Sequence, residues 1–151
     1  MNILFVCTGN TCRSCMAEVI FNNFCDVDGF KAYSAGLSIV KNSITSKSSA
    51  EIVMENLGLD ITSRKAVELT EIMLRDADLI LTMTDYMSSI IKNQFQNVKD
   101  KVYTLNTYVN KIGDIADPYG GNLNIYKNTY RDIESSIKLL IKKLKEDKGI
   151  L

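Results

Sequence analysis

Three of the four cysteines lie close together near the start of the chain, around one arginine. The stretch from Val6 to Cys15 reads VCTGNTCRSC, so that five residues separate Cys7 from Arg13 and Ser14 follows directly. A thiolate is a strong nucleophile, and a guanidinium can bind two oxygens of one phosphate group. These residue types at this spacing indicate nucleophilic chemistry on a bound phosphate group.

The residues between Cys7 and Arg13 are suited to hold an oxyanion. A loop of this length between a strand and a helix can turn its backbone N–H groups toward one centre, where the positive end of the helix dipole adds to them. Gly9 and Asn10 tolerate the backbone angles that such a turn requires. The same field favours the thiolate of Cys7, to which Ser14 can donate a hydrogen bond. We therefore predict a phosphate-binding loop.

A second group with suitable chemistry lies far downstream, in the sequence DPYGG. Pro118, the only proline of the chain, keeps Asp117 away from helical backbone angles and stiffens the segment. A carboxyl group held over the loop can protonate a leaving group and then activate water. Asp117 is therefore the candidate general acid and base.

The composition narrows the chemistry further. The chain has 151 residues and no histidine, which excludes Ser-His-Asp and Cys-His catalysis. Its 18 basic and 18 acidic residues balance, so that we expect neither a nucleic-acid nor a membrane partner. We see no secretory signal and expect a cytoplasmic protein without a disulfide scaffold.

The Cys12–Cys15 pair allows two other interpretations. One is a thioredoxin-like redox motif and the other is half of a zinc site. Without histidine, a zinc site would need all four cysteines, and Cys7 and Cys25 lie at opposite ends of their predicted elements. We therefore expect no metal and no other cofactor.

Apolar runs and helical periodicity alternate along the chain. We expect a cap at Ser48, in the sequence SSAE, to begin a helix that ends near Gly58. The other expected elements are strands at 2–6, 30–35, 78–83 and 101–105, a short helix from about residue 70, and helices at 14–24, 85–95 and around 133–144. This order predicts one α/β domain over residues 1–151, with a central four-stranded parallel sheet, helices on both faces and the phosphate-binding loop after the first strand.

Four motifs together resemble the low-molecular-weight protein tyrosine phosphatase family over nearly the whole chain. They are CTGNTCRS in the first loop, Ser34-Ala35-Gly36, the LILTM strand and DPYGG. Thr11 and the single aromatic residue before two glycines, Tyr119, are similar to the bacterial branch that removes phosphate from protein arginine. Tyrosine-specific relatives usually carry a bulky aliphatic residue at the Thr11 position.

The resemblance implies a role for each matching residue. Cys7 would attack phosphorus and form a thiophosphate intermediate. The phosphate oxygens would be bound by the side chain of Arg13 and by the backbone amides from Thr8 through Cys12 to Arg13. Ser14 would stabilise the thiolate, and Asp117 would act first as acid and then as base.

Further residues would support the site or control it. Asn10 and Ser34 would hold the loop in shape, and Thr11 and Tyr119 would line the entrance. Cys12 would pair with Cys7 under oxidation. Three features depart from the usual family pattern. Cys15 replaces a proline, Arg64 replaces a histidine that supports the loop, and residues 37–40 lack the aromatic residue that often forms one wall of the pocket. Cys15 thus adds a second thiol that can enter redox chemistry.

The sequence therefore predicts a metal-free cysteine phosphatase, with phosphoarginine in proteins as the preferred substrate and phosphotyrosine as the alternative. An arsenate reductase is less favoured because no cysteine follows Cys25. A non-catalytic module that binds an oxyanion or a phosphopeptide is also less favoured, because binding needs neither a thiol nor an acid. Phosphorylated proteins are the expected partners, and we expect a monomer.

Overall fold

A four-stranded parallel sheet forms the centre of the protein, as the sequence predicts. A computed structural model describes all residues 1–151. The strands lie in the order β2-β1-β3-β4. Their bounds are Asn2–Cys7 for β1, Lys31–Gly36 for β2, Leu79–Thr82 for β3 and Val102–Thr104 for β4.

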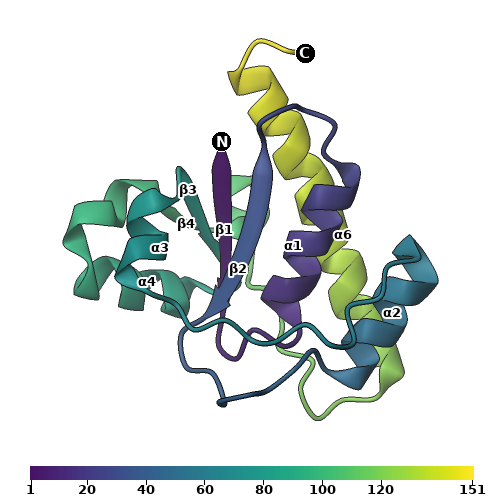
Figure 1. The fold of residues 1–151 in the computed structure, drawn as a ribbon. Coiled ribbons are helices and arrows are strands. Elements are labelled where there is room, and N and C mark those ends of the chain that lie inside the picture. Colours follow the sequence, from purple (N-terminus) through teal and green to yellow (C-terminus); the bar gives the residue numbers. More distant parts are fainter.

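Helices cover both faces of this sheet (Figure 1). One layer contains α1 (Arg13–Phe24), α2 (Lys47–Leu57) and the long α6 (Leu123–Asp147). The other contains α3 (Glu71–Asp76) and α4 (Asp85–Gln94). Two short helical segments, η1 (Gln96–Lys101) and α5 (Leu105–Tyr108), flank β4. No helix is both long enough and apolar enough to cross a membrane.

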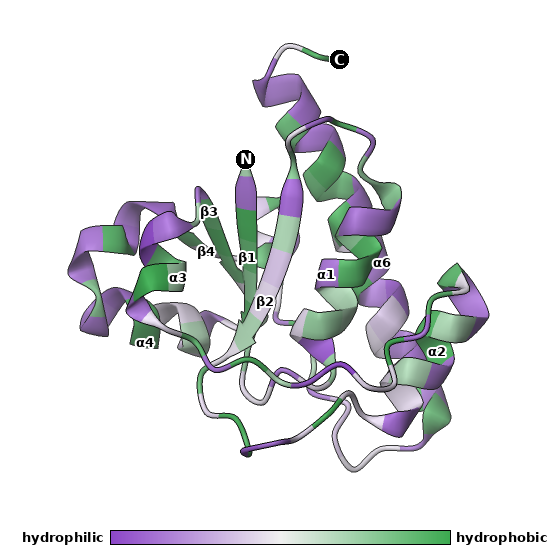
Figure 2. Cartoon of the chain, in the orientation of Figure 1, coloured by the Kyte–Doolittle hydropathy of each residue, from purple (hydrophilic) through white to green (hydrophobic).

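The alternation of side chains along β1 explains why both faces are covered. Ile3 and Phe5 are fully buried in the core shared with α1, α2 and α6, whereas Leu4 and Val6 belong to a second core beneath α3 and α4. A strand that is apolar on both faces must be covered on both. Figure 2 shows this apolar character along β1.

The expected start of α2 is wrong, because the helix is capped two residues earlier than Ser48. The cap is Ser46, whose Oγ accepts a hydrogen bond from the Ser49 amide at 3.2 Å. The reason lies outside the helix, because the Ser46 amide donates to the Thr11 carbonyl at 2.9 Å and holds Ser46 in an extended conformation. The expected end at Gly58 is confirmed, since Gly58 has a left-handed conformation with φ of 67°.

The strand order brings the connecting loops together at one edge of the sheet. The chain passes from β1 to β2 on one side of β1 and then returns to β3 on the other side. The loops after β1, β2 and β3 therefore meet at the carboxyl ends of the strands, at the bottom of Figure 1. This is the usual position of a ligand site in an open parallel sheet.

Candidate active site

The loop from Cys7 to Arg13 joins β1 directly to α1. Asn10 adopts a left-handed conformation with φ of 57°, which turns the loop back on itself. The helix begins after Cys12, whose side chain makes no capping hydrogen bond. Among the backbone amides from Thr8 to Arg13, only that of Asn10 has a partner in the protein. The others are free to bind an anion at the helix N-terminus.

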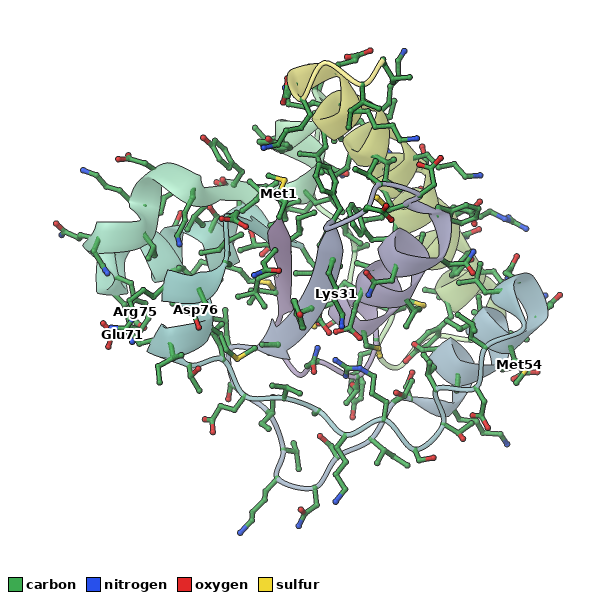
Figure 3. All side chains as sticks on the ribbon, turned by 45° about the horizontal axis from the view of Figure 1, so that its top comes forward. Met1, Lys31, Met54, Glu71, Arg75 and Asp76 are labelled. Atoms are coloured by element: carbon green, nitrogen blue, oxygen red, sulfur yellow. The ribbon has the colours of Figure 1, made fainter.

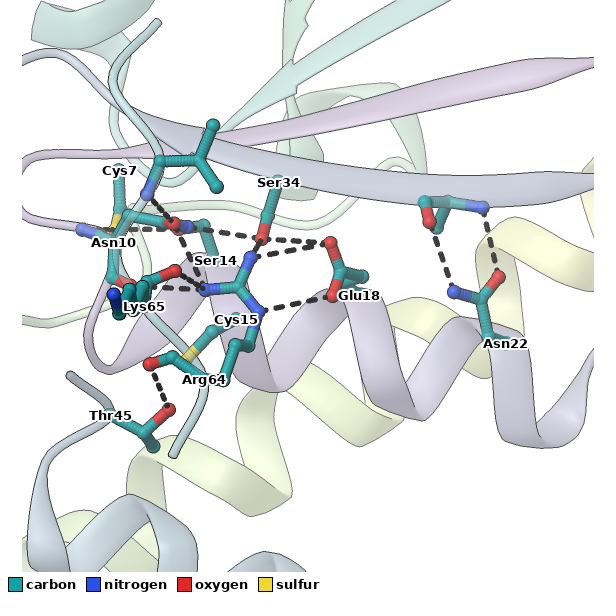
Figure 4. Close-up of polar contacts among 12 residues, drawn as sticks. Cys7, Asn10, Ser14, Cys15, Glu18, Asn22, Ser34, Thr45, Arg64 and Lys65 are labelled. Carbon is teal, nitrogen blue, oxygen red and sulfur yellow. Dashed lines mark hydrogen bonds and ion pairs between the residues drawn. The ribbon is translucent and has the colours of Figure 1, made fainter. Parts of the chain in front are cut away.

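The buried side chain of Asn10 holds this loop in place. Its Oδ1 accepts hydrogen bonds from the Val67 amide at 2.9 Å and from Arg64 Nη1 at 3.0 Å. Its Nδ2 donates to Ser14 Oγ at 2.8 Å and to Ser34 Oγ at 3.0 Å. All four hydrogen-bonding positions of the amide are therefore used, as Figure 4 shows.

These contacts place the Ser14 hydroxyl between the Asn10 side chain and the Cys7 sulfur. Ser14 Oγ accepts a hydrogen bond from Asn10 Nδ2, and it lies 2.8 Å from Cys7 Sγ. Its own proton is thus available to the sulfur, and the Asn10 amide donates to the same sulfur at 3.2 Å. The Ser14 hydroxyl and the Asn10 amide are thus both placed to donate a hydrogen bond to the Cys7 sulfur.

Arg64 and Glu18 form a partly buried ion pair behind the loop. Arg64 Nε lies 3.3 Å from Glu18 Oε2, and Arg64 Nη2 donates to Ser34 Oγ at 2.6 Å. Ser34 Oγ in turn donates to Glu18 Oε1 at 3.1 Å. In the sequence Arg64 stands out only as a departure from the family pattern and Glu18 not at all, because the two residues are 46 positions apart.

Arg13 and Asp117 face each other across the opening of the loop. The Arg13 side chain is buried and donates from Nη1 to the Ile115 carbonyl at 3.0 Å, while its Nη2 lies 3.5 Å from Asp117 Oδ2. The Asp117 side chain is 55% exposed, and its Oδ1 accepts a hydrogen bond from the Tyr119 amide at 3.0 Å. Asp117 is thus held near the loop while its side chain remains more than half exposed.

The loop and Asp117 enclose a pocket of about 580 Å³. It brings together the whole segment from Cys7 to Arg13 with Asp117 and Tyr119, whereas Ser14, Ser34 and Cys15 lie behind it. The remaining lining residues, none of them predicted as a site residue from the sequence, are Ser38, Val40, Ser43, Ile44, Ser46 and Tyr126. Most of them come from the segment between β2 and α2, which has no periodic pattern to reveal its position.

The two other cysteines near the loop differ in their surroundings. Cys12 Sγ lines the pocket and donates to Ser46 Oγ at 3.3 Å, with the Tyr126 hydroxyl at 3.7 Å. Burial, and then the hydrogen bond with Cys12, raises the pKa of Tyr126 to about 12. Cys15 is completely buried and donates to the Cys12 carbonyl at 3.1 Å; burial raises the pKa of its thiol.

The cysteines do not form a metal centre. All four are free thiols, and no three His, Cys, Asp or Glu side chains are grouped where they would hold a metal ion. The zinc interpretation of Cys12 and Cys15 therefore has no ligand set in this fold.

Comparison with known proteins places this site in a family. Residues 2–149 match the family described as low molecular weight phosphotyrosine protein phosphatase. The chain belongs to this family. The related proteins described next are phosphoprotein phosphatases, which confirms the expected enzyme class, a phosphoprotein phosphatase.

The relatives include enzymes named for two substrates. The chain is 40% identical to a protein-arginine-phosphatase of Bacillus subtilis (strain 168), over 98% of this chain and 99% of the relative. It is 38% identical to a low molecular weight protein-tyrosine-phosphatase, PtpB, of Staphylococcus aureus, over 97% and 98% of the two chains.

Solved structures resemble this fold along its full length. A YwlE arginine phosphatase that carries a phosphorylated active-site serine in place of cysteine superposes with a TM-score of 0.91, at 38% identity and with 100% of both chains covered. The YwlE arginine phosphatase of Geobacillus stearothermophilus gives a TM-score of 0.89 at 34% identity, over 97% of this chain and 94% of that one.

Proposed function

We propose that this protein hydrolyses phosphoarginine in proteins through a phosphocysteine intermediate, without a metal ion. The observation that carries the proposal is the single pocket that holds Cys7 Sγ, the free loop amides, Arg13 and Asp117. A phosphate group bound by the amides and Arg13 would lie against the sulfur, with Asp117 on the open side, where the leaving group must depart.

The reaction has two steps. The Cys7 thiolate attacks phosphorus and forms an S–P bond while the P–N bond to the substrate guanidinium breaks; Asp117 gives its proton to the departing nitrogen. Asp117, now a carboxylate, then takes a proton from a water molecule that attacks the same phosphorus. The S–P bond breaks, the thiolate is regenerated and inorganic phosphate leaves.

Thr11 supports arginine as the residue that carries the phosphate. Its side chain lines the pocket, where a threonine leaves more room than isoleucine or leucine and adds a hydroxyl group. A branched guanidinium with several N–H donors fits such a wall better than a phenyl ring. The carboxylate of Asp117, whose side chain is more than half exposed, can accept hydrogen bonds from the same guanidinium. Relatives named for either substrate have similar identities, so identity alone does not decide between them.

We also infer that the protein acts in the cytoplasm as a monomer, and that neither nucleic acid nor a membrane is its partner. The balanced charge of the chain supports the exclusion of nucleic acid, since such binding depends on an excess of lysine and arginine. Analytical ultracentrifugation would test the monomer.

The experiment is phosphate release from a phosphoarginine peptide under reducing conditions with a metal chelator present. The wild type should turn over many times, and Cys7→Ser should not. Asp117→Asn should retain peptide binding but lose about 10²- to 10⁴-fold in kcat, the usual contribution of a general acid. Undiminished turnover by Cys7→Ser would contradict the mechanism. If the wild type and Cys7→Ser bind the peptide equally and neither hydrolyses it, the protein is better described as a non-catalytic phosphopeptide-binding module.

A further inference from the structure

A second hollow adjoins the active-site pocket. It has a volume of about 800 Å³, and Ile44 lines both the hollow and the pocket. We call it the α2 groove. Its lining residues are Ile44, Thr45, Lys47, Ala50, Glu51, Met54, Asp60 and Thr62.

One face of α2 forms one side of this groove. Lys47, Ala50, Glu51 and Met54 follow the spacing i, i+3, i+4, i+7, which places them in one row along a helix. Ala50 is buried in the floor, whereas Met54 is 47% exposed. This face is therefore partly apolar and open to solvent.

The segment after α2 forms the opposite side. An antiparallel bridge between Ile44 and Lys65 fixes the end of this segment next to the active site. Asp60, five residues before Lys65, then lies toward the far end of the groove. Ser46, which caps α2, lines the active-site pocket, so the helix also leads away from the site.

Two carboxylates in the groove lack ionic partners. Neither Glu51 nor Asp60 is among the ion pairs of the protein. Asp60 Oδ1 accepts hydrogen bonds from the Thr62 amide at 2.9 Å and from its hydroxyl at 2.6 Å, which leaves Oδ2 free. Lys47 lies at the end next to the pocket, one turn before Glu51. The far part of the groove is thus acidic and borders the exposed Met54.

We propose that the α2 groove binds the polypeptide next to the phosphorylated residue of the substrate protein, and that it selects a segment with a basic residue. This inference rests on the proposed function, because a phosphorylated side chain must occupy the adjoining pocket. Ser46 and Met54 are eight residues apart, or about 12 Å along the helix, and an extended peptide covers that distance in about three or four residues. A lysine or arginine three or four positions from the phosphorylated residue would reach Glu51 and Asp60.

The test uses paired phosphoarginine peptides of about nine residues, which are long enough to span the pocket and the groove. One peptide of each pair carries Lys at the third or fourth position on one side of the phosphoarginine, and the other carries Glu there. We expect kcat/KM to be about three- to tenfold higher for the Lys peptide on one of the two sides, mainly through KM. The difference should shrink strongly in about 0.5 M NaCl.

The variant Glu51→Gln/Asp60→Asn should remove this preference and leave the hydrolysis of free phosphoarginine unchanged. The matched control is Glu71→Gln/Asp76→Asn, which removes one glutamate and one aspartate carboxylate from α3. Figure 3 labels Glu71 and Asp76 on the opposite side of the molecule from Met54 of α2. The control should retain the full preference.

The outcomes separate the two proposals. Equal kcat/KM for Lys and Glu peptides on both sides, or a preference that survives in Glu51→Gln/Asp60→Asn, would overturn the groove while phosphoarginine hydrolysis stands. If the protein hydrolyses only the phosphotyrosine versions of these peptides, the proposed substrate is wrong, and the same Lys and Glu comparison then decides the groove. No turnover of any phosphopeptide would overturn both.

Discussion

At the scale of single residues, the side chain of Asn10 connects Cys7, the proposed nucleophile, to the rest of the protein. It bridges Ser14, which contacts the Cys7 sulfur, and Arg64, which pairs with Glu18. The left-handed backbone at Asn10 could be expected from the sequence, since asparagine tolerates it. Its partners could not, because Val67 and Arg64 lie 57 and 54 positions away and only the tertiary fold brings them near.

Asn10→Ala should therefore damage both stability and catalysis. We expect a loss of about 2–4 kcal/mol in the free energy of unfolding from the lost buried hydrogen bonds and the strained backbone, and a decrease of at least about 10²-fold in kcat/KM. Urea unfolding and peptide kinetics would measure the two effects.

Asn110→Ala is the matched control for Asn10→Ala. Asn110 is exposed and also has a left-handed backbone, with φ of 62°. Asn110→Ala should introduce the strain of alanine in a left-handed backbone without the loss of side-chain hydrogen bonds, and it should leave kcat/KM unchanged. Equal losses of stability in the two variants would show that the hydrogen bonds of the Asn10 amide contribute little.

Cys12 and Cys15, the cysteines nearest to the proposed nucleophile Cys7, should respond differently to peroxide. The family resemblance predicts that Cys12 protects Cys7 as a disulfide, so Cys12→Ser should turn reversible inactivation into irreversible loss. The thiol of Cys15 is buried with a raised pKa and donates to a carbonyl, so Cys15→Ala should recover with dithiothreitol as the wild type does. Recovered activity and thiol mass spectrometry would distinguish these cases, and irreversible inactivation of Cys15→Ala would assign Cys15 the protective role instead.

At the scale of elements, the end of β2 limits the shape of the phosphate-binding loop. A Cβ atom at Gly36 would lie 2.6 Å from the Thr8 carbonyl oxygen and 3.1 Å from the Asn10 amide nitrogen. These atoms belong to the backbone and can move only if the loop moves. The strands at the centre of the sheet could be predicted from their short apolar runs, whereas this close approach depends on how β2 lies beside β1.

Gly36→Ala should therefore lower kcat/KM by at least about tenfold, because a shift of roughly 1 Å in catalytic groups has large effects. Gly58→Ala serves as the comparison, since Gly58 is left-handed but has open space around its Cα. That variant should lose about 1 kcal/mol of stability and keep its activity. Unchanged kinetics in Gly36→Ala would mean that the loop adapts to the side chain.

At the scale of the whole molecule, three long connections converge on the first loop. Backbone amides of the segment after β2 donate hydrogen bonds to the carbonyls of Cys7 and Thr11. In the segment after α2, the Val67 amide donates to the side chain of Asn10. The segment after α5 supplies Ile115, which holds Arg13. The two motifs that form the site, CTGNTCRS and DPYGG, could be recognised from the sequence alone. The connecting segments could not, because nonperiodic loops show their partners only in the folded chain.

Because so many segments meet at the anion site, a bound anion should stabilise the whole fold. Inorganic phosphate at about 100 times its Kd should add about 2.7 kcal/mol to the free energy of unfolding, which corresponds to a Tm increase of roughly 5–10 °C. Differential scanning calorimetry would measure it. Arg13→Ala should remove most of the increase, and an unchanged increase in this variant would place the anion elsewhere.

The most direct measurement compares kcat/KM on phosphoarginine and phosphotyrosine peptides of otherwise identical sequence, for the wild type and for Thr11→Ile, with Cys7→Ser as the blank. We predict that the wild type prefers phosphoarginine and that Thr11→Ile shifts the preference toward phosphotyrosine, because the pocket wall becomes bulkier and loses its hydroxyl group. A wild type that prefers phosphotyrosine, with a ratio that Thr11→Ile leaves unchanged, would contradict the proposed substrate and the role of Thr11.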